Sequence, residues 1–153
     1  AQVLLRAGDP RFPDLVRTTA DLASSTGQWP EAVHVRTKGG CMGDGHHVWA
    51  SAEWVLMVRN GFLREEGDRL ILGSGVFPAW LDQPEALTFG PAPSDFGEAS
   101  VRILPRDGAA EVQWSGNWRS DPSRVEVRLP GFEPVEAEVG KQSVFLSRRR
   151  STP

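Results

Sequence analysis

The chain is organised around residues 27–63, which read GQWPEAVHVRTKGGCMGDGHHVWASAEWVLMVRNGFL. The first part of this stretch is rich in Trp, Glu, His and Gly, and the second part is almost entirely apolar. Loops with titratable and aromatic side chains often carry function, because the elements on either side hold them in place. A helix that is apolar on nearly every face must also be covered on nearly every face. We therefore expect a functional loop at residues 27–46 and a deeply packed helix at about residues 47–63.

Composition and charge limit the classes of partner and cofactor. The chain has 153 residues and a formal net charge of -3, so no overall basic field attracts nucleic acid or an anionic membrane. Cys41 is the only cysteine, which excludes an intrachain disulfide and a cysteine-based zinc site. No apolar run reaches the roughly 18 residues that a membrane helix needs. We predict no cofactor, no nucleic-acid partner and no membrane partner, and the compartment stays open.

The first 63 residues have helical patterning. A short apolar segment at residues 1–7 ends at the turn Gly8-Asp9-Pro10. A helix begins at Phe12-Pro13-Asp14, where Pro suits the first turn and Asp suits the positive helix end. Gly27 is the expected end of this helix. Residues 1–63 are therefore predicted to be a helical hairpin whose connection is the loop at 27–46, with Asp44 or His46 capping the second helix.

From Arg64 the apolar residues alternate, as in half-buried antiparallel strands. Turn signals such as Asp107-Gly108 and Pro130-Gly131 separate these runs at the spacing of a β-sandwich. The predicted strands are residues 70–72, 86–89, 100–104, 111–114, 124–129, 135–139 and 143–146. A short helical turn is expected at residues 76–81, and a loop at residues 90–97. The predicted fold class is thus α+β: a helical hairpin at 1–63 followed by an antiparallel β-sandwich at 64–153.

The order of these segments resembles a known family. They read TGQWPEAV, GGCMGDGHH, VWASAEWVLMVRNGFL and REEGDRLILGSGVFPAWL, and alternating strands follow. Together they resemble the C-terminal end of six-hairpin α/α-barrel glycoside hydrolases, of the glucoamylase-like or rhamnosidase-like type. In such enzymes the last helices close the barrel, and a β-sandwich often follows. The resemblance implies that the N-terminal hairpin is the end of an α/α barrel.

The same resemblance points to Glu31 as a catalytic residue. In the glucoamylase-like family, the loop before the final barrel helix carries the catalytic base, and Glu31 in GQWPE fits that position. The sequence departs from the family because Ala32 follows this Glu instead of Gln, and because the sandwich follows the barrel instead of preceding it. Glycoside hydrolysis commonly needs two carboxyl groups, and here the second would come from upstream barrel loops. The isolated chain is therefore expected to be inactive.

Each candidate residue also has a simpler interpretation. Glu31 can be an exposed carboxylate after Pro30, and Trp29 can either stack on a sugar ring or fill the core. His46 can contact substrate or satisfy free N–H groups at a helix start. Adjacent histidines point in different directions and no third ligand is evident, so no metal site is predicted. Trp118, placed in the turn SGNWRSDP, is the surface aromatic that could contact carbohydrate.

These observations predict the C-terminal portion of a glycoside hydrolase, with one active-site loop and a stabilising sandwich. The predicted site consists of Glu31 as catalytic base, with Trp29, His46 and Trp118 as substrate-binding residues. The expected partners are a carbohydrate, bound through the parent barrel, and the upstream part of the same protein. The alternative is a non-catalytic module that binds carbohydrate or docks on another subunit through its apolar helix.

Overall fold

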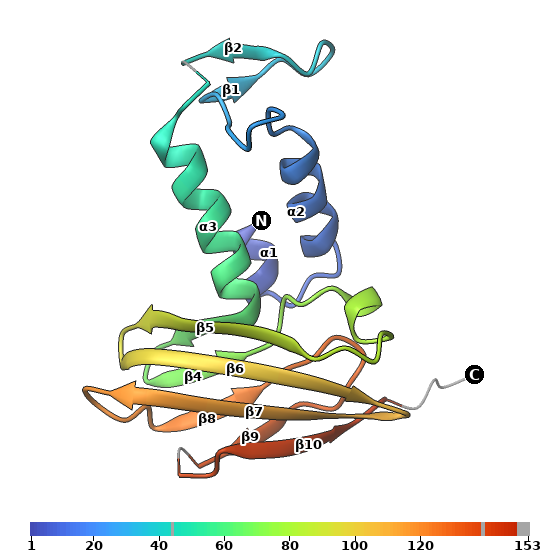
Figure 1. The fold of residues 1–153 in the computed structure, drawn as a ribbon, viewed down its shortest axis with the longest axis vertical. Coiled ribbons are helices and arrows are strands. Elements are labelled where there is room, and N and C mark those ends of the chain that lie inside the picture. Colours follow the sequence, from blue (N-terminus) through green and yellow to red (C-terminus); the bar gives the residue numbers. More distant parts are fainter. Residues whose placement is uncertain (44, 139, 150–153) are drawn as a thin grey trace. The chain divides into compact units, whose positions relative to one another are not determined.

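The computed structural model describes residues 1–43, 45–138 and 140–149, which form a mixed α+β protein (Figure 1). The chain divides into two compact units, Ala1–Val58 and Arg59–Pro153. The division falls inside the longest helix, α3 (Val48–Phe62). Each unit is described by itself. Within the described ranges, no helix is long and apolar enough to cross a membrane.

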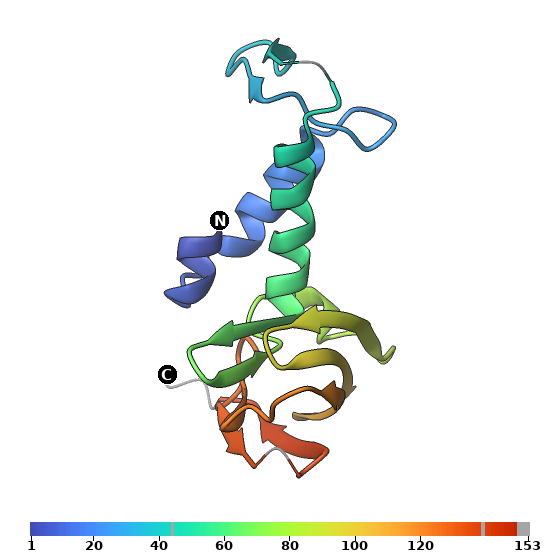
Figure 2. The same ribbon diagram turned by 90° about the vertical axis from the view of Figure 1, so that its left-hand side faces the viewer.

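Unit 1 contains three helices and a short hairpin. Helix α1 is Gln2–Arg6, α2 is Phe12–Asp21, and α3 contributes its residues up to Val58. Strands β1 (Ala32–Val33) and β2 (Gly40–Met42) pair in the connection between α2 and α3 (Figure 2). Helix α2 begins at Phe12 as predicted but ends at Asp21, well before Gly27. Ser24 explains the early end, because its hydroxyl accepts a hydrogen bond from the Gln28 N–H and so competes with helical pairing.

Helix α3 is less covered than its composition led us to expect. On one face Met57 is buried and Trp54 packs against Trp29, with 5.3 Å between the ring centroids. The other face leaves large apolar side chains exposed, including Trp49 at 68% and Val55 at 62%. The expectation of a deeply packed helix is wrong for the described residues, because two short helices cannot surround a third. We call the exposed set Val48, Trp49, Val55 and Leu56 the apolar stripe.

Unit 2 is built from two four-stranded sheets. One sheet has the order β10-β7-β6-β5, and the other has the order β3-β4-β8-β9. The pairings are antiparallel except for β4 with β8, which is parallel. The strands are β3 (Leu63–Glu66), β4 (Arg69–Leu72), β5 (Leu87–Ser94), β6 (Gly97–Arg106), β7 (Ala109–Trp118), β8 (Arg124–Val127), β9 (Val135–Ala137) and β10 (Ser143–Ser147).

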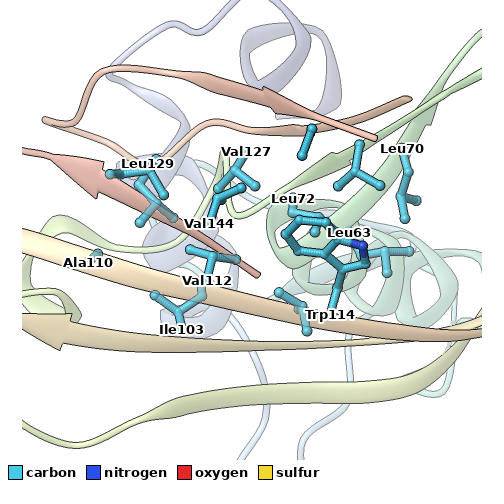
Figure 3. Close-up of a cluster of buried hydrophobic side chains, with 14 of the residues drawn as sticks. Leu63, Leu70, Leu72, Ile103, Ala110, Val112, Trp114, Val127, Leu129 and Val144 are labelled. Atoms are coloured by element: carbon cyan, nitrogen blue, oxygen red, sulfur yellow. The ribbon is translucent and has the colours of Figure 1, made fainter. Parts of the chain in front are cut away.

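Both sheets contribute to one apolar core. Figure 3 shows Val112 and Trp114 extending from β7 toward Leu63 and Leu72 of the other sheet. The neighbouring strand β6 contributes to the core in the same way. Its residues alternate, so Val101 and Ile103 are buried while Arg102 between them faces outward. Burying a side chain of this size contributes about 1.5–3 kcal/mol, so this cluster is the main source of stability in unit 2.

Several boundaries differ from the sequence-based expectation. Leu63–Glu66 is a strand instead of a helix end and turn, because Gly67 allows a tight reversal into β4 at φ 64°. Strand β5 continues through residues 90–94, where we expected a loop, and a register shift lets it pass Gly90-Pro91. Strand β8 ends at Val127 and β9 at Ala137. The predicted strand end at Val139 lies outside the described residues.

The expected helical turn at residues 76–81 is confirmed in a shorter form. It is the 3-10 helix η1, Pro78–Trp80, and Leu81 follows it as a buried anchor. Trp80 is less buried than Leu81 and stacks on Phe62, with 6.1 Å between the ring centroids. Phe62 stacks in turn on Phe89 of β5 at 5.0 Å. The aromatic residues of this turn therefore pack at the margin of the core.

Candidate functional site

The loop that the sequence singles out is a closed hairpin in unit 1. At its base, the His47 N–H donates to the Trp29 carbonyl over 3.0 Å. The next rung joins the Glu31 N–H to the Met42 carbonyl at 3.1 Å, and the tip is closed by the His34 N–H and the Gly39 carbonyl at 2.9 Å. The long connection is therefore tied together by backbone hydrogen bonds along its length. Sequence alone gave no sign of this pairing.

Gly43 allows the returning strand to pass close to Glu31. Its φ of 70° is rarely adopted by residues that carry a side chain, and a Cβ atom added there would lie 3.0 Å from the Glu31 Cβ. The backbone on both sides of Glu31 is thus fixed by a hydrogen bond and by this close approach. The carboxylate itself keeps a side-chain exposure of 45%. The backbone of Glu31 is therefore fixed, while its carboxylate remains accessible to solvent.

His47 is the residue that the structure brings to Glu31. Its Nε2 atom lies 4.0 Å from Oε2 of Glu31. Its Nδ1 atom accepts a hydrogen bond from the Ala50 N–H at 3.4 Å, in the position of an N-cap of α3. An Nδ1 atom that accepts carries no proton, so the ring proton of a neutral His47 is on Nε2, on the side of Glu31. The pair can orient a carboxylate for proton transfer.

The helix cap differs from the expectation. We expected Asp44 or His46 to cap α3, but His47 supplies the cap. Asp44 lies outside the described residues. His46 is exposed and engages in an interaction of its own, so its predicted contact with substrate stays a prediction. From the sequence, His47 was a candidate contact for substrate hydroxyls or a metal. Its pairing with Glu31 was missed because that pairing depends on where the helix starts.

Trp29 is packed inside the protein, which is the second of the two interpretations that its sequence allowed. The residue is 8% exposed, its ring contacts Trp54, and its Nε1 atom donates to the Thr19 carbonyl at 2.7 Å. This arrangement ties the base of the hairpin to α2 and α3. Trp29 therefore positions the backbone two residues before Glu31, and its proposed stacking on sugar stays a prediction.

Trp118 does not lie in a turn. It is the last residue of β7, pairs with Gly97, and packs partly buried against the core of unit 2. Its ring folds over Gly116, where an added Cβ would come within 2.1 Å of the ring. The expectation of a turn at Trp118 is wrong, because β7 continues beside β6 to this point. Within the described ranges, no cluster of three His, Cys, Asp or Glu side chains is arranged to hold a metal ion.

The strongest electrostatic feature of unit 2 is a network of ion pairs on the outer face of sheet β3-β4-β8-β9. Arg128 contacts Glu126 at 2.6 Å and Glu66 at 3.2 Å, and Glu66 also meets Arg64 at 2.6 Å. For Glu126, the hydrogen bond from Arg128 is the main cause that holds its pKa below the usual value of 4.5. Burial raises the pKa of Glu66, but the contacts with Arg64 and Arg128 together lower it further, so its net pKa is also below 4.5.

This network predicts a loss of stability in acid. Since the folded pKa values of Glu66 and Glu126 lie below their unfolded values near 4.5, their contribution is fully present above that pH. It is lost as the pH falls through the folded values. We expect the free energy of unfolding, measured with urea at a series of pH values, to fall steadily below about pH 5.

Substitution of one network carboxylate provides the control for this pH dependence. Glu126→Gln removes one of the two titrating groups, so its stability should depend less steeply on pH than that of the wild type. A wild-type stability that does not change between about pH 5 and pH 2.5 would contradict the argument, as would an unchanged slope in the variant.

The sequence matches no model of a protein family, and neither the curated proteins nor the solved structures give a match.

Proposed function

We propose that this chain is the C-terminal portion of an α/α-barrel glycoside hydrolase, in which the hairpin at residues 27–47 forms part of the sugar site. One observation carries the proposal: Glu31 is fixed through its backbone, accessible through its carboxylate, and placed beside the Nε2 atom of His47. The residue resemblance of this loop to the glucoamylase-like family supports the same function.

In this proposal Glu31 is the catalytic base. It would take a proton from the attacking water while a second carboxyl group, from the upstream chain, protonates the leaving oxygen. His47 would act as a positioning residue, because a proton on Nε2 can fix the orientation of the Glu31 carboxylate. His46 and Trp118 are proposed to contact carbohydrate, and Trp29 would support the loop from behind.

The proposal also assigns a place in the parent enzyme to each unit of the chain. Helices α2 and α3, which flank the hairpin, would be the last helical hairpin of the barrel. The two sheets of unit 2, which share one apolar core, would be the β-sandwich that follows it. The sandwich would stabilise the enzyme and would not take part in the chemistry of Glu31.

The apolar stripe of α3 supports a location within a larger protein. Val48, Trp49, Val55 and Leu56 recur at helical spacing and form one exposed face. A contiguous apolar surface of this kind marks an interaction site more often than a free surface. In an α/α barrel the neighbouring upstream helices would cover it.

The experiment that tests the proposal is a substitution of Glu31 in the natural full-length protein. Glu31→Gln preserves size and hydrogen bonding but cannot accept a proton, so we expect kcat on an oligosaccharide substrate to fall at least about 100-fold. Glu85→Gln is the matched control, because Glu85 is exposed and lies in unit 2, and it should retain wild-type activity. Equal activities in the two variants would remove the catalytic role from Glu31.

The intact mass of the endogenous protein provides an independent test. A natural chain with several hundred additional residues before Ala1 is what the proposal requires. A natural mass that corresponds to these 153 residues alone would contradict it. The exposed apolar stripe would then support the second candidate function, a module that docks on another subunit. That alternative expects the 153-residue chain to associate in solution, which light scattering measures directly.

A further inference from the structure

The outer face of sheet β10-β7-β6-β5 contains a hollow of about 510 Å³ that the proposed catalytic loop does not use. Strand register explains which side chains line it. Thr88, Arg102, Gln113 and Ser143 lie opposite one another on four successive strands and form one row. Ser100 and Ser115 are paired in the next row. Because the alternate residues of β6 and β7 are buried, both rows face away from the core.

The two outer faces of unit 2 differ in chemistry. On sheet β3-β4-β8-β9, the carboxylates of Glu66 and Glu126 are already paired with arginines. The rows that line the hollow instead carry hydroxyl groups, an amide and a single guanidinium. In the part of the chain that the structure describes, Arg102 forms neither a hydrogen bond nor an ion pair. Arg102 is also exposed, so its five N–H donors are available to a ligand.

Gln113 is held in place beside this guanidinium. Its Nε2 atom donates to Oε1 of Glu111 at 2.7 Å, which fixes the amide and leaves its Oε1 atom as an acceptor. Glu111 also lies 3.7 Å from Arg106, so its charge is already partly balanced. The two rows thus present one fixed acceptor, three serine hydroxyls, one threonine hydroxyl and one cation, and Gln142 also lines the hollow.

The shape of the hollow depends on strand β5. A register shift between Phe89 and Ala92 bends this strand where it borders the hollow. Gly90 makes the bend possible, since its φ is 110° and an added Cβ would lie 2.6 Å from the Ala99 carbonyl oxygen. The backbone of β5 can therefore approach β6 closely beside Ser100. A concave surface that includes these polar side chains results on this face of the sheet.

From this geometry we infer that the hollow is a binding site for an acidic oligosaccharide, with Arg102 contacting a uronate carboxylate. A guanidinium matches a carboxylate through two parallel hydrogen bonds, and this fit distinguishes a uronate from a neutral sugar. The serine, threonine and glutamine groups suit the hydroxyls of the neighbouring sugar units. The inference rests on unit 2 alone and is independent of the role of Glu31.

Titration of the 153-residue chain with uronate tetramers tests the inference. The probes are tetramers of galacturonate, glucuronate and mannuronate, each compared by calorimetry with its methyl ester, which has the same ring and no charge. We expect at least one acid tetramer to bind roughly tenfold more tightly than its ester at about 50 mM salt, where charge pairing is weakly screened. Equal affinities for acid and ester, or no binding by any of the tetramers, would overturn the inference.

Two variants assign the binding to this face. Arg102→Gln should abolish the preference for acid over ester, because it removes the guanidinium that lines the hollow. Arg124→Gln removes an equal charge from the opposite sheet, where Arg124 is exposed, and should keep the preference. Both side chains are exposed, so folding should be unaffected, and circular dichroism checks this. Equal losses in the two variants, or amide chemical-shift changes on residues outside the hollow, would contradict the assignment.

Discussion

Arg64→Ala is expected to lower the free energy of unfolding by about 3–5 kcal/mol, because it removes one partner from a buried ion pair. Arg64 is 1% exposed and donates from Nε and Nη2 to Glu66 at 3.1 and 2.6 Å. Its Nη1 atom also bonds the hydroxyl of Ser74. Alanine would leave an unfilled space next to a carboxylate that retains only its contact with Arg128. Urea denaturation of the chain at neutral pH measures the loss.

Arg69→Ala is the matched control for Arg64. Arg69 lies on the neighbouring strand β4 and faces the same side of the sheet, but its side chain is 42% exposed. Its contacts with Glu126 and Glu136 are 3.5 and 3.7 Å long. An exposed pair of this kind contributes at most about 1 kcal/mol, so the variant should remain close to the wild type. If the two variants lost comparable free energy of unfolding, burial would not be the reason that the contacts of Arg64 stabilise the fold.

Gly97→Ala is expected to destabilise unit 2 by at least about 3 kcal/mol, through backbone strain and overlap together. Gly97 begins strand β6 with a φ of 134°, a conformation that residues with a side chain rarely adopt. An added Cβ would lie 2.2 Å from the carbonyl oxygen of Asn117, which belongs to the partner strand β7. Relief of that overlap would require the β6–β7 pairing to open at this end. Thermal unfolding should report the change as a lower Tm.

Gly108→Ala separates strain from overlap. Gly108 also has a positive φ, 67°, but a Cβ added there meets nothing within 4 Å. Only the conformational cost applies, about 1 kcal/mol for a residue forced into this region. The two glycines lie at opposite ends of the same strand hairpin. If both variants lost the same stability, overlap with Asn117 would not be the cause at Gly97.

The strands of unit 2 were largely predictable from the sequence. Residue pairs such as Val101 and Ile103, or Val125 and Val127, alternate with polar residues, and the structure buries each pair on one side of a strand. Their order along the chain follows the predicted turns. The pairing of β4 with β8 was not predictable, because it joins segments more than 50 residues apart in a parallel register that no local pattern encodes.

The first element of unit 2 was missed for a physical reason. Leu63–Glu66 contains residues that suit a helix as well as a strand, and it follows directly on α3. What decides its conformation is pairing with β4, which places Leu63 opposite Leu72 in the core. Tertiary packing thus overrides the local preference here.

The sequence singled out the loop at residues 27–46, but it did not predict the contacts within this loop. Glu31 was singled out by the family resemblance of its loop, and the structure fixes its backbone on a hairpin. The partner His47 depends on the exact start of α3, and the placement of Trp29 depends on Trp54 being turned toward it. Side-chain directions of this kind follow from backbone hydrogen bonds that connect residues 29 and 47.

The bent strand β5 also affects how unit 2 meets other chains. It is an edge strand, and the unpaired edge of a sheet is a template for aggregation. Pro91 and Pro93 have no N–H group, and the carbonyl of Pro93 already accepts a hydrogen bond from Arg59 at 2.7 Å. A neighbouring chain finds too few donors and acceptors here to form a continuous ladder. The same segment that shapes the hollow therefore protects this edge of the sheet from pairing with another chain.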